Sequence, residues 1–266
     1  MAAAAARPGL RRDPAGGPIR PRKRFGQHFL RDTGVLRRIV EAVSPSPDDA
    51  LVEIGPGEGA LTRVLLERVP HLTVVEIDRD LAARLRAEFA PERLTVHCAD
   101  ALDFDFGALP QGARIVGNLP YNISTPLLFR LVESAGRVRD LHFMLQLEVV
   151  QRMVARPSTP EYGRLSVMLQ TRFAMQKLFR VAPGAFRPPP KVESAVVRLL
   201  PLAARADFPQ AAFADVVRRA FSARRKTLRN ALPGVDLAAL GIDPGLRPEN
   251  LSPEDYLRIT SRLAAR

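Results

Sequence analysis

The residues best suited to chemistry begin with a glycine-rich segment, Gly55-Pro56-Gly57-Glu58-Gly59. It follows an apolar run at residues 50–54 and precedes a helical pattern at residues 60–69. Glycines at such a turn let a ligand approach the backbone closely, and the N-terminus of the next helix favours an anionic or polar group. A tight turn without a ligand is the alternative. The spacing is not the Gly-x-Gly-x-x-Gly of dinucleotide sites, which argues against a dehydrogenase.

Two acidic side chains follow the next two apolar runs. Glu76 closes the run at residues 72–77, and Asp100 comes just after the run at residues 94–98. A carboxylate at the end of the second strand can accept hydrogen bonds from both hydroxyls of a ribose, although a surface acid closing a strand is the simpler alternative. Asp100 or its neighbours could hold an adenine amino group. The first three strand ends therefore predict one nucleoside pocket.

The segment Asn118-Leu119-Pro120-Tyr121 ends the fourth apolar run, at residues 113–117. The exocyclic nitrogen of adenine is a poor nucleophile because its lone pair is delocalised into the ring. Two acceptors aimed at its N–H bonds would draw it toward a reactive, tetrahedral geometry. We expect these acceptors to be the side-chain oxygen of Asn118 and the backbone carbonyl of Leu119. Pro120 would set the turn and Tyr121 would offer a flat face to the base; an ordinary turn is the alternative.

The elements that position these residues alternate between strand and helix from residue 50 to residue 155. Beyond the runs already named, we expect a strand at residues 141–147 and helices at residues 33–43, 79–89 and 124–134, the first with Thr33 as a possible N-cap. This alternation predicts a mostly parallel sheet with helices on both faces. Two β-like stretches, residues 165–181 and 191–200, are joined by a proline-rich turn and should pair antiparallel.

The two ends of the chain differ in composition from the central part. Residues 1–24 hold Ala, Pro, Gly and Arg without apolar periodicity and are expected to be a disordered basic arm. Residues 25–204 would form the catalytic domain, and the helical, basic pattern at residues 205–266 would form a small RNA-binding domain.

Charge points to a polyanionic partner. Forty Lys and Arg residues against 28 Asp and Glu residues give a formal net charge of +12. Such a surface attracts nucleic acid, although a solvated basic surface is the alternative. The basic residues gather near the N-terminus and in a cluster without acids, formed by Arg218, Arg219, Arg224, Arg225, Lys226 and Arg229.

Other bulk features exclude several classes of protein. Cys98 is the only cysteine, so an internal disulfide or a cysteine-based zinc site cannot form. The sequence contains no apolar run near the ~20 residues that span a bilayer and no secretory pattern at its start. We therefore expect a monomeric enzyme of the cytoplasm with no metal and no membrane partner.

Taken together and in this order, the motifs resemble those of the ribosomal RNA adenine N6,N6-dimethyltransferases that modify small-subunit rRNA. The resemblance extends from about residue 22 to residue 260. Besides the segments above, it rests on residues 24–30 (RFGQHFL), 162–167 (YGRLSV), 188–192 (PPPKV) and 224–230 (RRKTLRN).

This resemblance implies an α/β fold: a Rossmann-like class I S-adenosylmethionine-dependent methyltransferase sheet, mostly parallel with an antiparallel end strand, plus a small all-helical C-terminal domain. It implies S-adenosylmethionine as cofactor, with His28 and Leu30 closing the pocket over it. The other residues expected to contact the cofactor are Gly55, Gly57, Glu76, Asp100 and Asn118.

The implied substrate is a pair of adjacent adenines in the 3′-terminal hairpin loop of small-subunit rRNA, each receiving two methyl groups, within a precursor of the small ribosomal subunit. Phe186 would be a second stacking face for the target base, or a core residue. Arg224, Arg225 and Lys226 would contact phosphates.

Three other functions compete with this interpretation. A macrolide-resistance methyltransferase of large-subunit rRNA would share the chemistry, but residues 162–167 and 224–230 look more like the small-subunit group. DNA adenine methyltransferases tend to carry proline at the position of Leu119. A non-catalytic ribosome-assembly factor would be expected to have lost the glycines or Asn118, and all are present.

Overall fold

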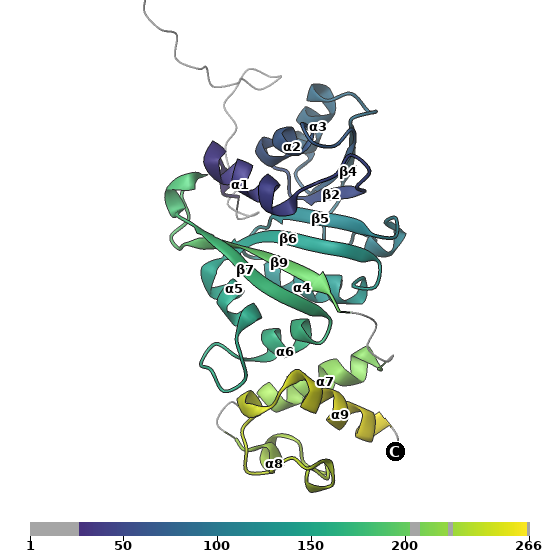
Figure 1. Cartoon of the computed structure of the whole chain (residues 1–266), viewed down its shortest axis with the longest axis vertical. Coiled ribbons are helices and arrows are strands. Elements are labelled where there is room, and N and C mark those ends of the chain that lie inside the picture. Colours follow the sequence, from purple (N-terminus) through teal and green to yellow (C-terminus); the bar gives the residue numbers. More distant parts are fainter. Residues whose placement is uncertain (1–26, 203–207, 223–225, 265–266) are drawn as a thin grey trace, which may run out of the picture.

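The computed structural model describes residues 27–202, 208–222 and 226–264. The predicted basic arm and the predicted boundary between residues 204 and 205 lie outside these ranges. The described residues form a layered α/β body with a group of helices at one end (Figure 1).

A seven-stranded sheet forms the centre of the body, in the order β4-β3-β2-β5-β6-β9-β7. The first five strands in this order, β4, β3, β2, β5 and β6, are parallel to one another. Strand β9 runs antiparallel to both of its neighbours, β6 and β7. The strand bounds are β2 Leu51–Ile54, β3 Leu72–Glu76, β4 Leu94–Cys98, β5 Ala113–Asn118, β6 Val138–Gln146, β7 Phe173–Val181 and β9 Ser194–Pro201.

The mostly parallel sheet and the antiparallel pairing of β7 with β9 confirm the prediction. The reversed strand, however, lies one place in from the edge, and β7 is the edge strand. The burial of the two strands explains this order, because most residues of β9 are buried whereas β7 is buried mainly at its two ends. The more apolar strand takes the position that is covered on both sides.

Helices cover both faces of the sheet, as the alternation predicts. Leu51 and Val52 are neighbours in β2 but point to opposite faces and belong to different apolar clusters. The cluster around Leu51 includes residues of α1 (Thr33–Val43), α2 (Ala60–Leu65) and α3 (Arg79–Glu88). The cluster around Val52 includes residues of α4 (Ser124–Glu133) and α5 (Leu147–Val154).

Two local predictions are wrong. The N-cap of α1 is Asp32 and not Thr33, because the Asp32 side chain accepts a hydrogen bond of 2.9 Å from the Val35 backbone N–H. Residues 165–170, expected to open a strand, belong to the helix α6 (Arg164–Gln170). A short apolar run does not distinguish a buried helix from a strand, and α6 buries Val167, Met168 and Leu169.

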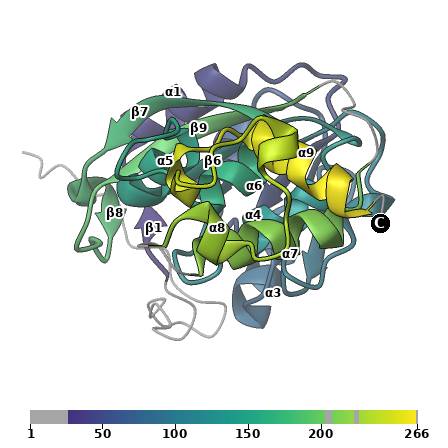
Figure 2. The ribbon, with the colours of Figure 1, turned by 90° about the horizontal axis from the view of Figure 1, so that it is seen from below.

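The C-terminal helices α7 and α9 pack against α6, and α8 packs against α7 (Figure 2). Their bounds are α7 Gln210–Phe221, α8 Leu228–Ala231 and α9 Pro253–Ala264. The apolar cluster of Phe213, Val217 and Tyr256 also contains Tyr162 and Met168, from the segment before β7. The hydroxyl of Tyr162 donates a hydrogen bond of 2.9 Å to the Leu251 carbonyl. The helical end is therefore joined to the sheet domain through a common core.

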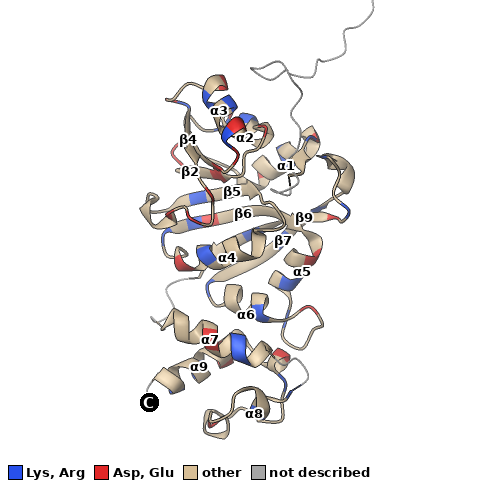
Figure 3. Cartoon of the chain, turned by 180° about the vertical axis from the view of Figure 1, so that it is seen from behind, with Lys and Arg blue, Asp and Glu red and all other residues tan. Residues whose placement is uncertain are grey.

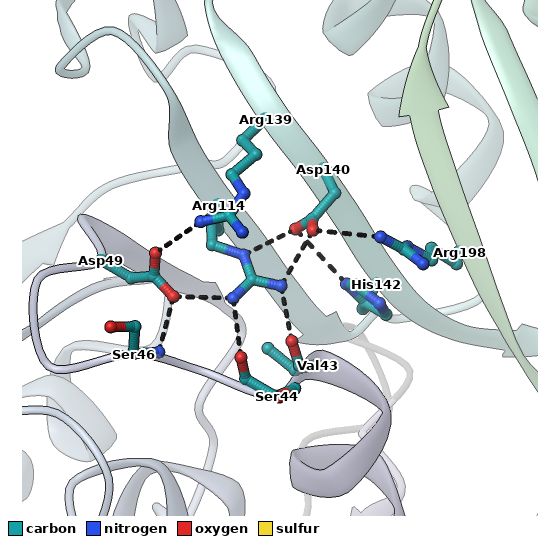
Figure 4. Close-up of polar contacts among 9 residues, drawn as sticks. All are labelled: Val43, Ser44, Ser46, Asp49, Arg114, Arg139, Asp140, His142 and Arg198. Atoms are coloured by element: carbon teal, nitrogen blue, oxygen red, sulfur yellow. Dashed lines mark hydrogen bonds and ion pairs between the residues drawn. The ribbon is translucent and has the colours of Figure 1, made fainter.

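A buried ionic network joins the amino ends of the central strands (Figure 4). Arg114 at the start of β5 makes two hydrogen bonds to Asp140 of β6, at 2.9 and 2.8 Å, and one of 2.7 Å to Asp49. Its guanidinium also donates to the carbonyls of Val43 and Ser44 at the end of α1. Burial opposes ionisation of Asp140, but the nearby His142 ring and the hydrogen bonds from Arg114 outweigh it and lower the pKa of Asp140 to about 2.

A second, two-stranded sheet lies beside the first. β1 (Phe29–Leu30) pairs antiparallel with β8 (Phe186–Arg187), so that Leu30 is opposite Phe186. Sequence periodicity does not reveal this pair, because each strand has only two residues. No helix in the described part of the chain combines the length and apolar character that crossing a membrane requires.

Candidate active site

A cavity of about 320 Å³ opens where the carboxyl ends of β2 and β5 meet. From β2 the chain builds β3 and β4 on one side and then returns to build β5 on the other. Such a reversal of strand order leaves a crevice at the carboxyl edge of the sheet. The cavity wall includes the predicted residues His28, Leu30, Gly55, Gly57, Glu76, Asp100, Asn118, Leu119, Pro120 and Tyr121.

The glycine-rich segment forms one side of this cavity. Gly55 and Gly57 have φ angles of 69° and 57°, in the left-handed region that favours glycine. A Cβ atom on Gly57 would lie 3.0 Å from the ring of Phe29, which also lines the cavity. Arg31, beyond β1, forms an ion pair with Glu58 of the same segment. The β1 segment and the glycine loop are thus held against each other.

Glu76 links the loop to the next strand. Its carboxylate accepts a hydrogen bond of 3.0 Å from the Gly57 backbone N–H and one of 2.9 Å from the Asp78 backbone N–H. Burial raises the pKa of this carboxyl, although the two backbone donors act in the opposite direction. Each carboxylate oxygen can accept more than one hydrogen bond, so Glu76 can also accept from the hydroxyls of a bound ribose.

Asp100 also lines the cavity. One carboxylate oxygen accepts a hydrogen bond of 2.8 Å from the Leu102 backbone N–H, which fixes the side chain beside the pocket wall. This is the place expected for it after β4.

Asn118 has its side-chain amide oriented by its partner. Its Nδ2 donates a hydrogen bond of 3.0 Å to the backbone carbonyl of His28. A carbonyl can only accept, so the amide nitrogen must face His28 and the amide oxygen Oδ1 must point elsewhere. This orientation leaves Oδ1 able to act as an acceptor, the role that the sequence predicts for it.

Tyr121 and His28 form a stacked pair beside Asn118. Their ring centroids are 5.5 Å apart and their planes differ by 29°. The Tyr121 hydroxyl lies 2.7 Å from the Ser194 hydroxyl, and burial raises the pKa of this phenol, so it is neutral at physiological pH. His28 Nδ1 lies 2.8 Å from the Pro188 carbonyl, which requires this nitrogen to carry a proton. The aromatic face predicted at Tyr121 is present and held from two sides.

Three residues at the carboxyl edge of the sheet were not predicted from the sequence. Glu53 and Ile77 line the cavity, and Ile77 is an exposed apolar residue directly after Glu76. A carboxyl in the otherwise apolar run of residues 50–54 was the available signal for Glu53. Burial raises the pKa of Glu53 to about 8, although the Thr62 hydroxyl, 2.6 Å away, donates a hydrogen bond to it.

The third is Gly117, which permits a close approach of two strands. A Cβ atom at this position would lie 2.5 Å from the Ile54 carbonyl oxygen of β2. Gly117 and Ile54 are paired in the β2–β5 ladder, immediately before Asn118 and Gly55. A side chain here would push apart the two strand ends that carry the proposed site.

Other predicted residues lie away from the cavity. Phe186 is 4% exposed and packs in the apolar cluster that contains Leu30, so it is a core residue and does not present a stacking face. Its apolar surface is covered because β8 pairs with β1. Lys226 is exposed in the helical end, apart from the cavity wall. Arg224 and Arg225 lie outside the described residues.

Comparison of the sequence with known families gives a match to the model described as "Ribosomal RNA adenine dimethylase" over residues 19–265. The chain is 62% identical over 253 residues to the ribosomal RNA small subunit methyltransferase A of Thiobacillus denitrificans, covering 92% of this chain and 99% of that protein. It is 59% identical to the protein of the same name from Aromatoleum aromaticum, covering 93% and 96% of the two chains.

Solved structures give the same result for the fold. A dimethyladenosine transferase from Plasmodium falciparum matches with a TM-score of 0.78 and 26% identity, over 90% of this chain and 98% of that one. The 23S rRNA methyltransferase ErmE matches with a TM-score of 0.67 and 30% identity, over 89% and 99%. The similarity covers both the sheet and the helical end.

Proposed function

This chain belongs to the ribosomal RNA adenine dimethylase family, and from that premise we propose how its cavity performs the reaction. It is an S-adenosylmethionine-dependent enzyme that dimethylates the N6 amino groups of two adjacent adenines in small-subunit rRNA. The identity to small-subunit enzymes is twice that to the large-subunit enzyme ErmE, so the large-subunit alternative is not favoured.

The cavity has the groups that S-adenosylmethionine needs. Glu76 offers a buried carboxylate for the ribose hydroxyls, and Gly55 and Gly57 line the cavity beside it without side chains. Asp100 and Ile77 lie along the same wall, where they can hold the adenine ring of the cofactor by its edge and its face. The bound cofactor supplies an electrophilic methyl group on a sulfonium with a good leaving group.

The observation that carries the proposal is the orientation of Asn118. With Nδ2 committed to His28, Oδ1 accepts a hydrogen bond from the target amino group. The Leu119 carbonyl accepts from the second N–H bond, Pro120 sets the turn between them, and Tyr121 stacks on the base. These contacts orient the nitrogen lone pair toward the methyl group, and orientation supplies a large share of the rate.

A basic surface is available for the RNA. Exposed arginines occur on successive helices from α4 to α7, at Arg130, Arg152, Arg164 and Arg218, and Figure 3 shows these helices with basic segments. Together with Arg224, Arg225 and Lys226, they would contact rRNA phosphates within a small-subunit precursor, to which the enzyme binds as a monomer. Contacts of this kind weaken with salt.

The test uses the protein and its Asn118→Ala variant with S-adenosylmethionine and unmethylated small ribosomal subunits. Nucleosides from the digested rRNA are then measured by mass spectrometry. We expect N6,N6-dimethyladenosine only with the unaltered protein. An absence of methylated adenosine with both proteins, despite binding to the subunits, would overturn the catalytic proposal in favour of an assembly factor.

A further inference from the structure

A second cavity, of about 280 Å³, lies at the carboxyl end of β6, one strand beyond Asn118. Asn118 is opposite Met144 in the β5–β6 ladder, and Gln146 follows two residues later at the end of the strand. The second cavity is lined by Gln146, Leu147, Glu148, Gln151, Val192 and Glu193. It therefore opens on the same edge of the sheet as the proposed active site.

Ser194 contacts Tyr121 of the first cavity wall and directly follows Glu193 of the second cavity wall. Its hydroxyl lies 2.7 Å from the Tyr121 hydroxyl, and it is opposite Gln146 in the β6–β9 ladder. The backbone N–H of Leu147 donates a hydrogen bond of 2.9 Å to the Glu193 carbonyl, which closes the floor of the second cavity. The Tyr121–Ser194 contact and the pairing of Ser194 with Gln146 therefore relate a residue of the first cavity wall to one of the second.

The side chains of the second cavity suit a nucleobase. The amides of Gln146 and Gln151 have no hydrogen-bond partner among the described residues, so donors and acceptors are available. Val192 is a large apolar side chain that is 46% exposed, and it offers an apolar contact. Glutamine amides pair well with the amino group and ring nitrogen of adenine, and the apolar face of a base packs favourably against an aliphatic side chain such as Val192.

The charges of the second cavity do not exclude RNA. Glu148 forms an ion pair with Arg152, and Glu193 lies 3.8 Å from Arg180. Lys191, directly before Val192, is exposed and carries a positive charge for a phosphate. Each carboxylate therefore has a neighbouring cation, and the repulsion of a nearby phosphate is reduced.

We propose that the second cavity binds the adenine next to the target adenine while the target occupies the first cavity. This inference rests on the proposed function, in which the target base stacks on Tyr121. Val192, Gln146 and Gln151 would then be positioning residues. They hold the RNA strand by the neighbouring base and so bring the target nitrogen into place.

The test combines substitutions in the protein with substitutions in the RNA. Val192→Ser and Gln151→Ala are compared with Leu200→Ser and Gln176→Ala, exposed residues on β9 and β7 that lie outside both cavities. The substrates are unmethylated small subunits with the native adenine pair and subunits in which either adenine is replaced by uracil. The value of kcat/KM for the remaining target is measured with each protein, together with the affinity for S-adenosylmethionine.

On native subunits, we expect each cavity variant to lose about tenfold in kcat/KM and the two controls to match the unaltered protein. Replacing the neighbouring adenine should lower kcat/KM of the unaltered protein about tenfold. It should lower kcat/KM of the cavity variants very little, because they have already lost the contact with that adenine. Cofactor affinity should not change. The inference would be overturned if the losses of kcat/KM from the cavity variant and from the replaced adenine multiplied as independent effects. It would also be overturned if the cavity variants had the same kcat/KM as the controls. If the unaltered protein methylates no subunits, the proposed function itself fails.

Discussion

The side-chain Nδ2 of Asn118 donates a hydrogen bond of 3.0 Å to the backbone carbonyl of His28, a residue 90 positions earlier in the chain. His28 precedes β1, and Asn118 ends β5, so the bond joins two segments that both line the cavity. The contact sets the amide orientation and helps to hold the segment that contains His28.

Replacing Asn118 by Asp should lower the single-turnover rate of methyl transfer about a hundredfold. A carboxylate oxygen cannot donate to the His28 carbonyl, so the side chain must turn and the acceptor for the target amino group is misplaced. The control is Asn122→Asp, which introduces the same charge in the same segment at an exposed position. Equal losses for both variants would show that charge, and not the hydrogen bond to His28, is responsible.

Gly117→Ala should destabilise the fold by about 1–3 kcal/mol and weaken S-adenosylmethionine binding. The added Cβ atom would lie 2.5 Å from the Ile54 carbonyl oxygen and force the ends of β2 and β5 apart. Gly136→Ala, where a Cβ atom meets nothing within 4 Å, is the matched control and should behave like the unaltered protein. Urea unfolding and calorimetric titration measure the two effects. A variant with normal cofactor affinity would disprove the link between this contact and the site.

The Glu53 carboxyl should make stability depend on pH in a defined direction. Its pKa rises from an ordinary value of 4.5 to about 8 in the folded protein. The folded state therefore holds a proton that the unfolded state has lost, and this contribution to stability declines as pH rises from about 4.5 to about 8. The free energy of unfolding, measured in urea across this window, should fall less steeply for Glu53→Gln than for the unaltered protein. Parallel pH profiles would contradict the assignment.

Arg114→Ala should reduce the free energy of unfolding by about 3–5 kcal/mol, because it leaves the buried carboxylate of Asp140 without its main partner. Arg139→Ala is the control. Arg139 also contacts Asp49, at 3.0 Å, but its side chain is 62% exposed, so its removal should cost about 0–1 kcal/mol. Similar losses for the two variants, measured by urea unfolding, would show that burial of the network has no special role.

Neutralising Arg224, Arg225 and Lys226 together should weaken binding to small ribosomal subunits and make it less sensitive to salt. Fewer phosphate contacts release fewer counterions, so the slope of log affinity against log salt should become shallower. The affinity for S-adenosylmethionine should be unchanged, since Lys226 is not part of the cavity wall. Equal losses of RNA and cofactor binding in titrations would contradict this separation of roles.

Sequence periodicity predicted the parallel sheet because its strands are apolar runs between helical patterns, and such runs are visible without tertiary information. It failed at residues 165–170 and in the two-residue strands β1 and β8, where a segment is too short for its period to identify it. The burial of Phe186 could not be predicted either, because it depends on the pairing of β8 with β1, which places the Phe186 ring in the core.

The sequence by itself determined the family, the chemistry and the residues around the cavity, since motifs at strand ends must meet at the carboxyl edge of a parallel sheet. Only the tertiary structure decided which way the Asn118 amide points, because its partner at His28 is 90 residues away. It also decided that Gly117 must lack a side chain and that Gln146 and Val192 share a cavity beside Tyr121. These relationships depend on contacts between segments distant in the chain, for which the local sequence carries no signal.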